Sequence, residues 1–376
     1  MLPDGLIGRF FLVWGILRRT FGFTLRPLLG FVLLSIYHVV LRAGLMLDHV
    51  FFPGARRRAL DRPIFVVGAP RSGTTFLHRF LCDSGVGCGH EVWHILLPSL
   101  TLRALARPFI PWLSRRLPRF SDSKAHDTSL TSVETDDALV FARFFDGLFL
   151  YGYQLAWDDA DHSDYVDPHG HPARTAARDF AWLRACLVRN AHWHRKDRVV
   201  AKLFSMSFRP AAALQAFPDA RMIYLVRDPL ETVPSGMSLV SGTILQRMPV
   251  SKVAPEVRKR YFDRLYQASI GLYRGFLDAE SAGQLPARNV LVVRYDVLMK
   301  DFSSEMKRIL DFIEVVPDDA FSARIAETAA RQARWKSEHR YDLATYGIDR
   351  DRLLRDFQFV YTAYNLPRPT PPPAST

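Results

Sequence analysis

The chain has 376 residues, of which 48% are hydrophobic and 23% charged, and its formal net charge at pH 7 is +12. This is the composition of a globular protein with one large or two ordinary domains, and it excludes a wholly disordered chain. The three cysteines form no C-x-x-C pair, no Asn-x-Ser/Thr sequon occurs, and no nucleic-acid-binding pattern accompanies the basic residues. These absences argue against a disulfide framework, a zinc finger and nucleic-acid binding, and favour a reducing compartment.

Residues 5–52 are far more apolar than the rest of the chain, with arginines interspersed. The longest stretch without Lys, Arg, Asp or Glu runs from Pro27 to Leu41, which is shorter than the ~20 residues of a spanning helix. A snorkelling Arg42 would extend it to Leu47. Arginine among Phe, Trp and Leu is typical of a helix at a membrane interface. We therefore expect residues 1–58 to be a membrane-associating helical segment, with a packed helical layer or an oligomer contact as the alternative.

Four short apolar runs beyond this segment predict buried strands, at 64–67, 198–204, 221–226 and 289–295. Segments with helical periodicity lie between or after them, at 73–82, 173–191, 229–240, 255–279 and 302–314. This alternation predicts an α/β fold with a parallel sheet that helices cover on both faces. The stretch 98–125 is read as loop and short helix, and the polar stretch 158–172 as a loop. We expect a second domain over 59–365 and a disordered Pro-rich tail over 366–376.

The segment "IFVVGAPRSGTTFLHRFL" (64–81) runs from a predicted strand through a glycine-containing turn into a helix. Such a turn directs main-chain N–H groups at an anion bound at the helix N-terminus. Gly68 and Gly73 have the spacing of a nucleotide-binding Walker A loop, but Thr74 stands where that motif has its lysine. Arg71 supplies a positive charge instead, and Thr74 and Thr75 supply hydroxyl donors.

The sequence "PRSGTT" resembles the 5′-phosphosulfate loop of sulfotransferases that use 3′-phosphoadenosine 5′-phosphosulfate (PAPS), and the resemblance covers roughly residues 62–360. It implies a P-loop-type fold and sulfuryl transfer from PAPS. It also implies which residues hold the phosphosulfate: Arg71, Ser72, Gly73, Thr74 and Thr75.

A second anion site is predicted in "YLVRDPLETVPSGMSL" (224–239), where Arg227 ends a strand and Ser235 lies in the following helix. Asp228 is a suitable N-cap, and Glu231 would complete a capping box. This arrangement resembles the family's R-[DN]-P-x5-S site for the 3′-phosphate of the donor. The alternative is a salt-bridged arginine beside an ordinary helical serine.

Further contacts to the donor follow from weaker resemblances. By resemblance to the family's strand–"YEDL"–helix region, Tyr295 is a candidate adenine contact, with a core tyrosine as the alternative. Arg334 or Lys336 would add cations near the 3′-phosphate, with a solvated basic face as the alternative.

Sulfuryl transfer needs a base to take the acceptor's proton, and many family members carry a histidine two residues after a strand lysine. Lys202 matches that lysine, but Phe204 occupies the histidine's position. Glu91 is the best replacement, because a carboxyl in an apolar, Trp-flanked setting has a raised pKa. His90 is the second candidate. Other groups in "SVETDDALVF" stay open, namely Glu134, Asp136 and Asp137.

The sequence thus predicts a PAPS-dependent sulfotransferase that acts on a hydroxyl, or less favourably an amine, of a small molecule, membrane lipid or glycan. The product of the donor would be 3′,5′-adenosine bisphosphate, and no metal is required. The expected location is the cytoplasmic side of a bacterial inner membrane, and the oligomeric state stays open. Rival readings are a P-loop kinase-like phosphotransferase and a non-catalytic, membrane-associated nucleotide-binding protein. The missing lysine at position 74 speaks against the first.

Overall fold

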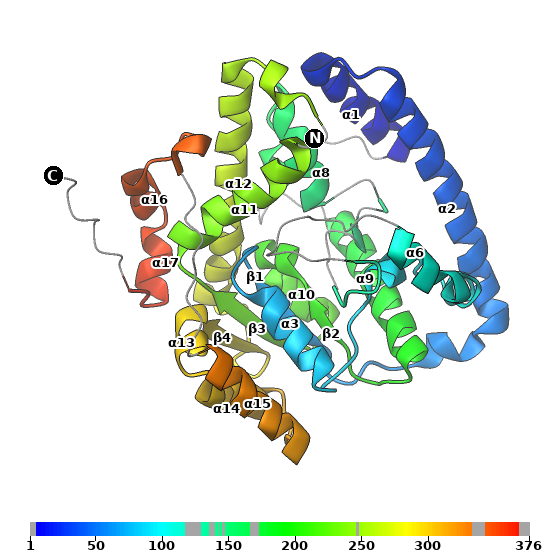
Figure 1. Cartoon of the computed structure of the whole chain (residues 1–376), viewed down its shortest axis with the longest axis vertical. Coiled ribbons are helices and arrows are strands. Elements are labelled where there is room, and N and C mark those ends of the chain that lie inside the picture. Colours follow the sequence, from blue (N-terminus) through cyan, green and yellow to red (C-terminus); the bar gives the residue numbers. More distant parts are fainter. Residues whose placement is uncertain are drawn as a thin grey trace.

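In the computed structural model of the chain, the described residues are 5–116, 129–134, 140–141, 143–144, 147–165, 173–245, 248–332 and 343–367. A parallel sheet of four strands lies at the centre, in the order β2-β1-β3-β4 (Figure 1). The strands are β1 (Ile64–Gly68), β2 (Val200–Lys202), β3 (Arg221–Val226) and β4 (Val290–Arg294). The predicted parallel α/β architecture is therefore confirmed. The run predicted as a strand at 198–204 pairs over fewer residues, since a 3₁₀ turn begins at Phe204.

Neighbouring side chains of each strand point to opposite faces of the sheet and therefore enter two separate cores. Ile64 and Ile223 belong to a smaller core, whereas Phe65 and Met222 belong to a larger one. The smaller core is covered by α3 (Thr74–Asp83), α13 (Tyr295–Lys300), α14 (Phe302–Phe312) and α15 (Asp319–Gln332). The larger core is covered by α9 (Ala173–His194), α10 (Pro210–Ala216), α11 (Pro229–Leu245), α12 (Pro255–Ser281), α16 (Arg350–Asp356) and α17 (Gln358–Ala363). Helices thus lie on both faces, as a buried parallel sheet requires.

The N-terminal segment forms two helices, α1 (Leu6–Phe21) and α2 (Leu25–Phe51). One face of α1 belongs to the larger core through Val13, Ile16 and Leu17. Among the described residues, α2 is the one helix long and apolar enough to cross a membrane, with a mean hydropathy of 1.9 and 11% of its most apolar window buried. The long apolar helix expected near the N-terminus is therefore present. The domain boundaries at 58 and 365 stay predictions.

Short helices occupy much of the chain that the sequence pattern left unassigned. The connection after α3 contains α4 (Val92–Leu96), α5 (Leu100–Ala106) and α6 (Ile110–Arg116), and α8 (Leu148–Tyr153) follows. The predicted tail lies outside the described residues beyond position 367.

Candidate functional site

The loop between β1 and α3 is built around two glycines whose side-chain space is occupied. A Cβ atom on Gly68 would lie 2.4 Å from the main-chain oxygen of Leu225, and one on Gly73 would lie 2.6 Å from the Tyr295 ring. Gly73 also has a φ of +94°, which favours glycine. Ser72 is fully buried, and its Oγ atom finds no hydrogen-bond partner among the described residues. A buried hydroxyl without a partner in such a loop fits an anionic ligand that would supply the missing bond.

The two predicted anion sites lie in direct contact with each other. Arg71 Nε donates a hydrogen bond to Ser235 Oγ over 2.8 Å, and Arg227 Nη1 donates to the main-chain oxygen of Arg71 over 3.0 Å. The Arg227 guanidinium also lies 4.3 Å from the centre of the Tyr295 ring, a cation–π distance. The structure thus brings Arg71, Arg227, Ser235 and Tyr295 into one cluster at the carboxyl end of the sheet, where ligands bind in open α/β sheets.

The helix start after Arg227 differs in one detail from the predicted capping box. Asp228 Oδ1 accepts a hydrogen bond from Leu230 N over 2.9 Å, as an N-cap does. Glu231 instead forms an ion pair with Arg227. A carboxylate and an anionic ligand would compete for the same guanidinium, so this ion pair would oppose an anion placed beside Arg227.

A buried ion-pair group lies on the other side of the loop. Lys202, at the end of β2, pairs with Glu134, and its Nζ atom lies 3.4 Å from Thr75 Oγ1. Arg79 Nη2 donates to Glu134 Oε2 over 3.1 Å. Burial alone would raise the pKa of the Glu134 carboxyl, but the charges and hydrogen bonds of Lys202 and Arg79 outweigh it and hold that pKa below its usual value. Glu134 is therefore an ionised, buried carboxylate beside the loop between β1 and α3 (residues 69–73), which we call the phosphate loop.

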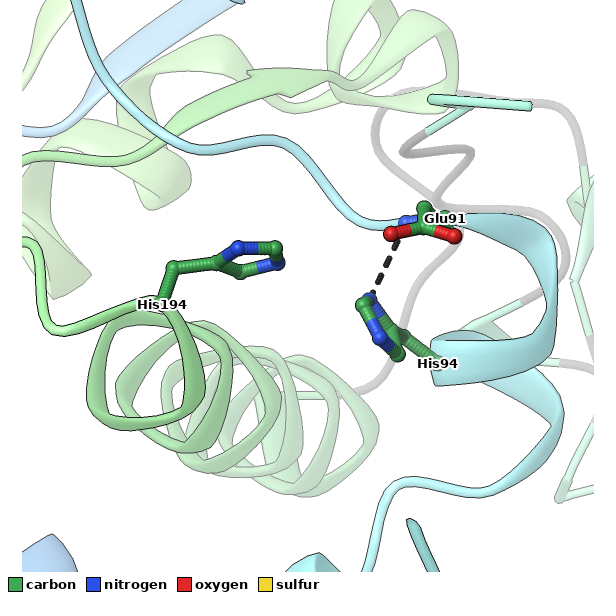
Figure 2. Close-up of side chains that lie close together, drawn as sticks. All are labelled: Glu91, His94 and His194. Atoms are coloured by element: carbon green, nitrogen blue, oxygen red, sulfur yellow. Dashed lines mark hydrogen bonds between the residues drawn. The ribbon is translucent and has the colours of Figure 1, made fainter. Parts of the chain in front are cut away.

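Glu91 lies at the N-cap of α4, and Figure 2 shows His94 and His194 facing it. Its carboxylate accepts a hydrogen bond from Trp93 Nε1 over 2.9 Å, and its main-chain N–H donates to His94 Nδ1 over 3.3 Å. Burial raises the pKa of Glu91, although the indole hydrogen bond opposes this. The raised pKa agrees with the sequence-based expectation, but the carboxylate is bonded to its own helix.

The potential ligand atoms of Glu91, His94 and His194 lie within 4.8 Å of one another. Burial lowers the pKa of both histidines, so both imidazoles are neutral. A carboxylate and two neutral imidazoles form a donor set that a divalent transition metal can use. The buried guanidinium of Arg103 opposes this, because the same positive charge that lowers the pKa of all three groups would repel a cation bound among them.

His90, the second candidate base, is 1% exposed, and its Nε2 atom lies 3.2 Å from the main-chain oxygen of Cys186. Burial holds the pKa of His90 well below the usual value. The side chain lines an apolar cavity of about 280 Å³ between α2, α4 and α9. Other residues that line it include Leu34, Tyr37, Ile95 and Trp182.

The cavity and the ion-pair group are linked through one main-chain hydrogen bond. Glu134 N donates to the His90 main-chain oxygen over 2.7 Å, and Glu91 and Val133 form an antiparallel bridge beside it. Residues 129–134 therefore return to residues 90–93 and place Glu134 next to Lys202.

Four of the predicted site residues lie outside the part of the chain that the structure describes, and two features of the site were not predicted from the sequence. Asp136, Asp137, Arg334 and Lys336 lie outside the described residues. The contact between Lys202 and Glu134 was missed because 67 residues separate the two along the chain. Arg79 was missed as well, although its position one helical turn after Thr75 places both side chains on one face of α3.

Over residues 63–319 the chain matches a family model described as "Sulfotransferase family". It is 26% identical over 325 residues to omega-hydroxy-beta-dihydromenaquinone-9 sulfotransferase Stf3 of Mycobacterium bovis, and the alignment covers 84% of this chain and 78% of the relative. The protein of the same name from Mycobacterium tuberculosis matches equally well.

Two crystal structures of mycobacterial proteins share the fold. Sulfotransferase STF1 of Mycobacterium tuberculosis superposes with a TM-score of 0.66 at 17% identity, over 93% of this chain and 90% of its own. Sulfotransferase STF9 of Mycobacterium avium gives a TM-score of 0.65 at 18% identity, over 86% of this chain and 82% of its own. At such identities the likeness concerns the fold alone.

Proposed function

Because the chain belongs to the sulfotransferase family, we propose that it transfers the sulfuryl group of PAPS to the hydroxyl of an acceptor that has an apolar body. The observation that carries the donor assignment is the joined cluster of Arg71, Ser235 and Arg227 at the phosphate loop. A loop of N–H and hydroxyl donors followed by a guanidinium pair suits a ligand with phosphate groups at two separate positions.

The donor would lie across this cluster. The loop N–H groups, with Ser72, Thr74 and Thr75, would bind the 5′-phosphosulfate at the N-terminus of α3, and Arg71 would add its charge. Arg227 and Ser235 would bind the 3′-phosphate. Tyr295 would contact the adenine, a role that its place between Gly73 and the Arg227 guanidinium supports.

For the general base we propose Glu134, because it is the carboxylate that lies against Lys202 next to the phosphate loop. In the in-line step, the acceptor oxygen forms a bond to sulfur while its proton passes to Glu134. The bond from sulfur to the bridging oxygen breaks, and 3′,5′-adenosine bisphosphate leaves with the electron pair. Lys202 would stabilise the negative charge on the sulfuryl and leaving oxygens.

Donor binding would also prepare the base. The sulfonate oxygens would draw Lys202 away from Glu134, which removes the main cause of the lowered pKa and makes the carboxylate a stronger proton acceptor. Glu91 is the other carboxylate candidate, supported by its raised pKa. Its bonds to Trp93 and to α4 favour a role in positioning residues 90–93 instead.

The cavity beneath α2 is the proposed binding site for the apolar part of the acceptor. Its walls are mostly apolar, and His90 connects it to Glu134 by one main-chain hydrogen bond. Leu34 and Tyr37 of the exposed helix α2 line it, which supports a membrane lipid as acceptor. The name of the mycobacterial relative also points to a lipid, a menaquinone. We place the protein at the cytoplasmic side of a membrane.

Calorimetry with 3′,5′-adenosine bisphosphate and with ATP tests the donor assignment. We expect tight binding of the bisphosphate and weak binding of ATP, and the reverse order would favour a kinase-like activity. Incubating the protein with PAPS and a lipid extract tests the reaction. Mass spectrometry should then reveal a lipid that is heavier by one SO₃ group, and bisphosphate binding without any sulfated product would favour a non-catalytic protein.

A further inference from the structure

Helix α2 exposes a continuous apolar stripe along nearly its whole length and runs along one side of the molecule (Figure 1). The exposed residues recur at the three- and four-residue spacing of one helix face. They are Leu25, Leu28, Leu29, Val32, Leu33, Ile36, Val39, Val40, Met46, Leu47, Val50 and Phe51. A stripe of this kind is far larger than the scattered exposed apolar residues of a soluble monomer, so it indicates an interaction surface.

Neighbouring helices extend the stripe. Gly44 of α2 packs closely on Leu102 of α5, since a Cβ atom on Gly44 would lie 2.5 Å from Leu102 Cγ. The chain from α5 to α6 exposes Leu105, Phe109 and Trp112. We call the α2 stripe and these three residues the apolar surface.

The charges around the apolar surface have one sign. Arg18, Arg26, Arg42, Arg107, Arg115 and Arg116 are exposed. The only acidic residue in 5–52 and 100–116 is Asp48, which is 4% exposed. Two of the arginines lie over tryptophan rings, Arg18 over Trp14 and Arg116 over Trp112. A second copy of the chain would bring arginines together without carboxylates, whereas an anionic leaflet offers a phosphate for each one.

Helix α2 is fixed to the rest of the protein at several points along its axis. The Phe31 ring stacks on Phe10 at 4.0 Å, and Tyr37 Oη donates to the Leu96 main-chain oxygen over 3.0 Å. From the contact of Phe31 to those of Asp48, these attachments span 17 residues of α2, which is ~26 Å of helix at 1.5 Å per residue. A spanning helix would have to leave all of them.

The contact at Asp48 is the hardest to break. Its carboxylate accepts hydrogen bonds from Ser99 Oγ over 2.8 Å and from Thr101 N over 2.8 Å, and it pairs with Arg189 at 3.1 Å. Burial alone would raise the pKa of Asp48, but these hydrogen bonds outweigh it and lower that pKa. Moving α2 across a bilayer would carry an ionised carboxylate toward lipid and leave the start of α5 without its acceptor.

We propose that α2 lies flat in one leaflet of an anionic membrane, with α5 and α6 beside it, and does not span the bilayer. The apolar surface faces the acyl chains, the arginines contact the headgroup phosphates, and the cavity lined by Leu34 and Tyr37 lies beneath the inserted helix. The proposal rests on the membrane-facing acceptor of the proposed function. Bisphosphate binding is therefore measured on every variant, so that loss of the surface is distinguished from loss of the fold or of the donor site.

The first experiment is flotation with vesicles of phosphatidylcholine and phosphatidylglycerol. The double substitution V39D/V50D places two charges on residues that are 68% and 69% exposed, and V316D is the matched control because Val316 is 94% exposed away from the apolar surface. We expect V39D/V50D to lower vesicle binding at least tenfold and V316D to leave it unchanged, with bisphosphate binding intact in both. Equal vesicle binding by all three proteins overturns the proposal. So does a soluble dimer without vesicle binding that V39D/V50D dissociates.

The second experiment separates lying flat from spanning. A fluorophore is attached to the cysteine that L29C, V39C or V50C introduces, and the labelled unsubstituted chain, whose own cysteines are buried or half-buried, gives the background. Nitroxide lipids that quench near the headgroup or near the acyl-chain end then report the depth. We expect all three positions to be quenched best by the shallow probe. Quenching of position 39 by the deep probe, with shallow positions 29 and 50, overturns the flat orientation even if vesicles bind.

Discussion

Arg227 donates a hydrogen bond from its guanidinium to the main-chain oxygen of Arg71 over 3.0 Å, which ties the second anion site to the phosphate loop. Arg71 has a φ of +73°, a left-handed conformation that costs a non-glycine residue ~1–2 kcal/mol. The Arg227 contact and the bond from Arg71 to Ser235 hold that conformation in place. The loop between β1 and α3 and the second predicted anion site therefore form one coupled structure.

Arg71→Ala and Arg227→Ala should each weaken binding of 3′,5′-adenosine bisphosphate by about tenfold to hundredfold, since each removes a charge-assisted contact of ~1.5–3 kcal/mol. Because the two residues contact each other, the double variant should lose less than the product of the single losses. Calorimetry on the four proteins measures this coupling, and Lys307→Ala, at an exposed site, is the control. Unchanged affinity in both single variants would contradict the donor assignment.

Glu134→Gln should lower kcat by ~10²–10⁴-fold and leave bisphosphate affinity near that of the unsubstituted protein, because it removes a base and keeps the shape. Glu91→Gln is the matched control, since glutamine can still accept the hydrogen bonds from Trp93 and from α4. Steady-state rates with a sulfated product as readout compare the two. Loss of kcat in Glu91→Gln alone would assign the base to Glu91, and loss in His90→Asn alone would assign it to His90.

Gly73→Ala should weaken bisphosphate binding about tenfold or more, a loss of ~1.4 kcal/mol, because its methyl group would displace the Tyr295 ring. Gly85→Ala is a close control: its φ of +79° is also left-handed, but a Cβ atom there meets nothing within 4 Å. Both variants should lose some thermal stability, and only Gly73→Ala should lose affinity. Equal affinities would show that Tyr295 does not border the nucleotide.

Stability should fall as the pH falls from about 6.5 to about 4, partly because of His78. Burial lowers the pKa of His78 to about 4, so the unfolded chain takes up a proton in this window and the folded chain does not. Above a pH of about 6.5, His78 is neutral in both states and does not change the free energy of unfolding. Between about 6.5 and 4 the free energy of unfolding falls, by on the order of 3 kcal/mol in total. Denaturant unfolding between pH 7.5 and 5 measures it, and His78→Gln should flatten the profile. An unchanged profile in that variant would assign the pH dependence to other groups.

The sequence predicted the parts of this protein that depend on neighbours along the chain. The strand, loop and helix around Gly68 and Gly73 could be read directly, because strand periodicity, glycines and helical periodicity follow one another there. The contact between Lys202 and Glu134 could not, because it depends on how residues 129–134 return to residues 90–93. The raised pKa of Glu91 was also expected correctly, but the sequence could not show that Trp93 donates to its carboxylate.

The return of residues 129–134 to residues 90–93 has a consequence for how the protein tolerates change. Val92 N donates to the Ser132 oxygen, Trp93 N donates to the Leu130 oxygen, and Glu134 N donates to the His90 oxygen. These three bonds close a loop whose two ends lie together, so the length of the chain between them does not determine where Glu134 lies. The position of Glu134 is therefore insulated from the exposed side chains of the connection: substituting Leu105 or Phe109, which point away from the buried contact of Ile110 with Trp93 and Leu130, should leave the rate constant of sulfuryl transfer to a small test alcohol nearly the same.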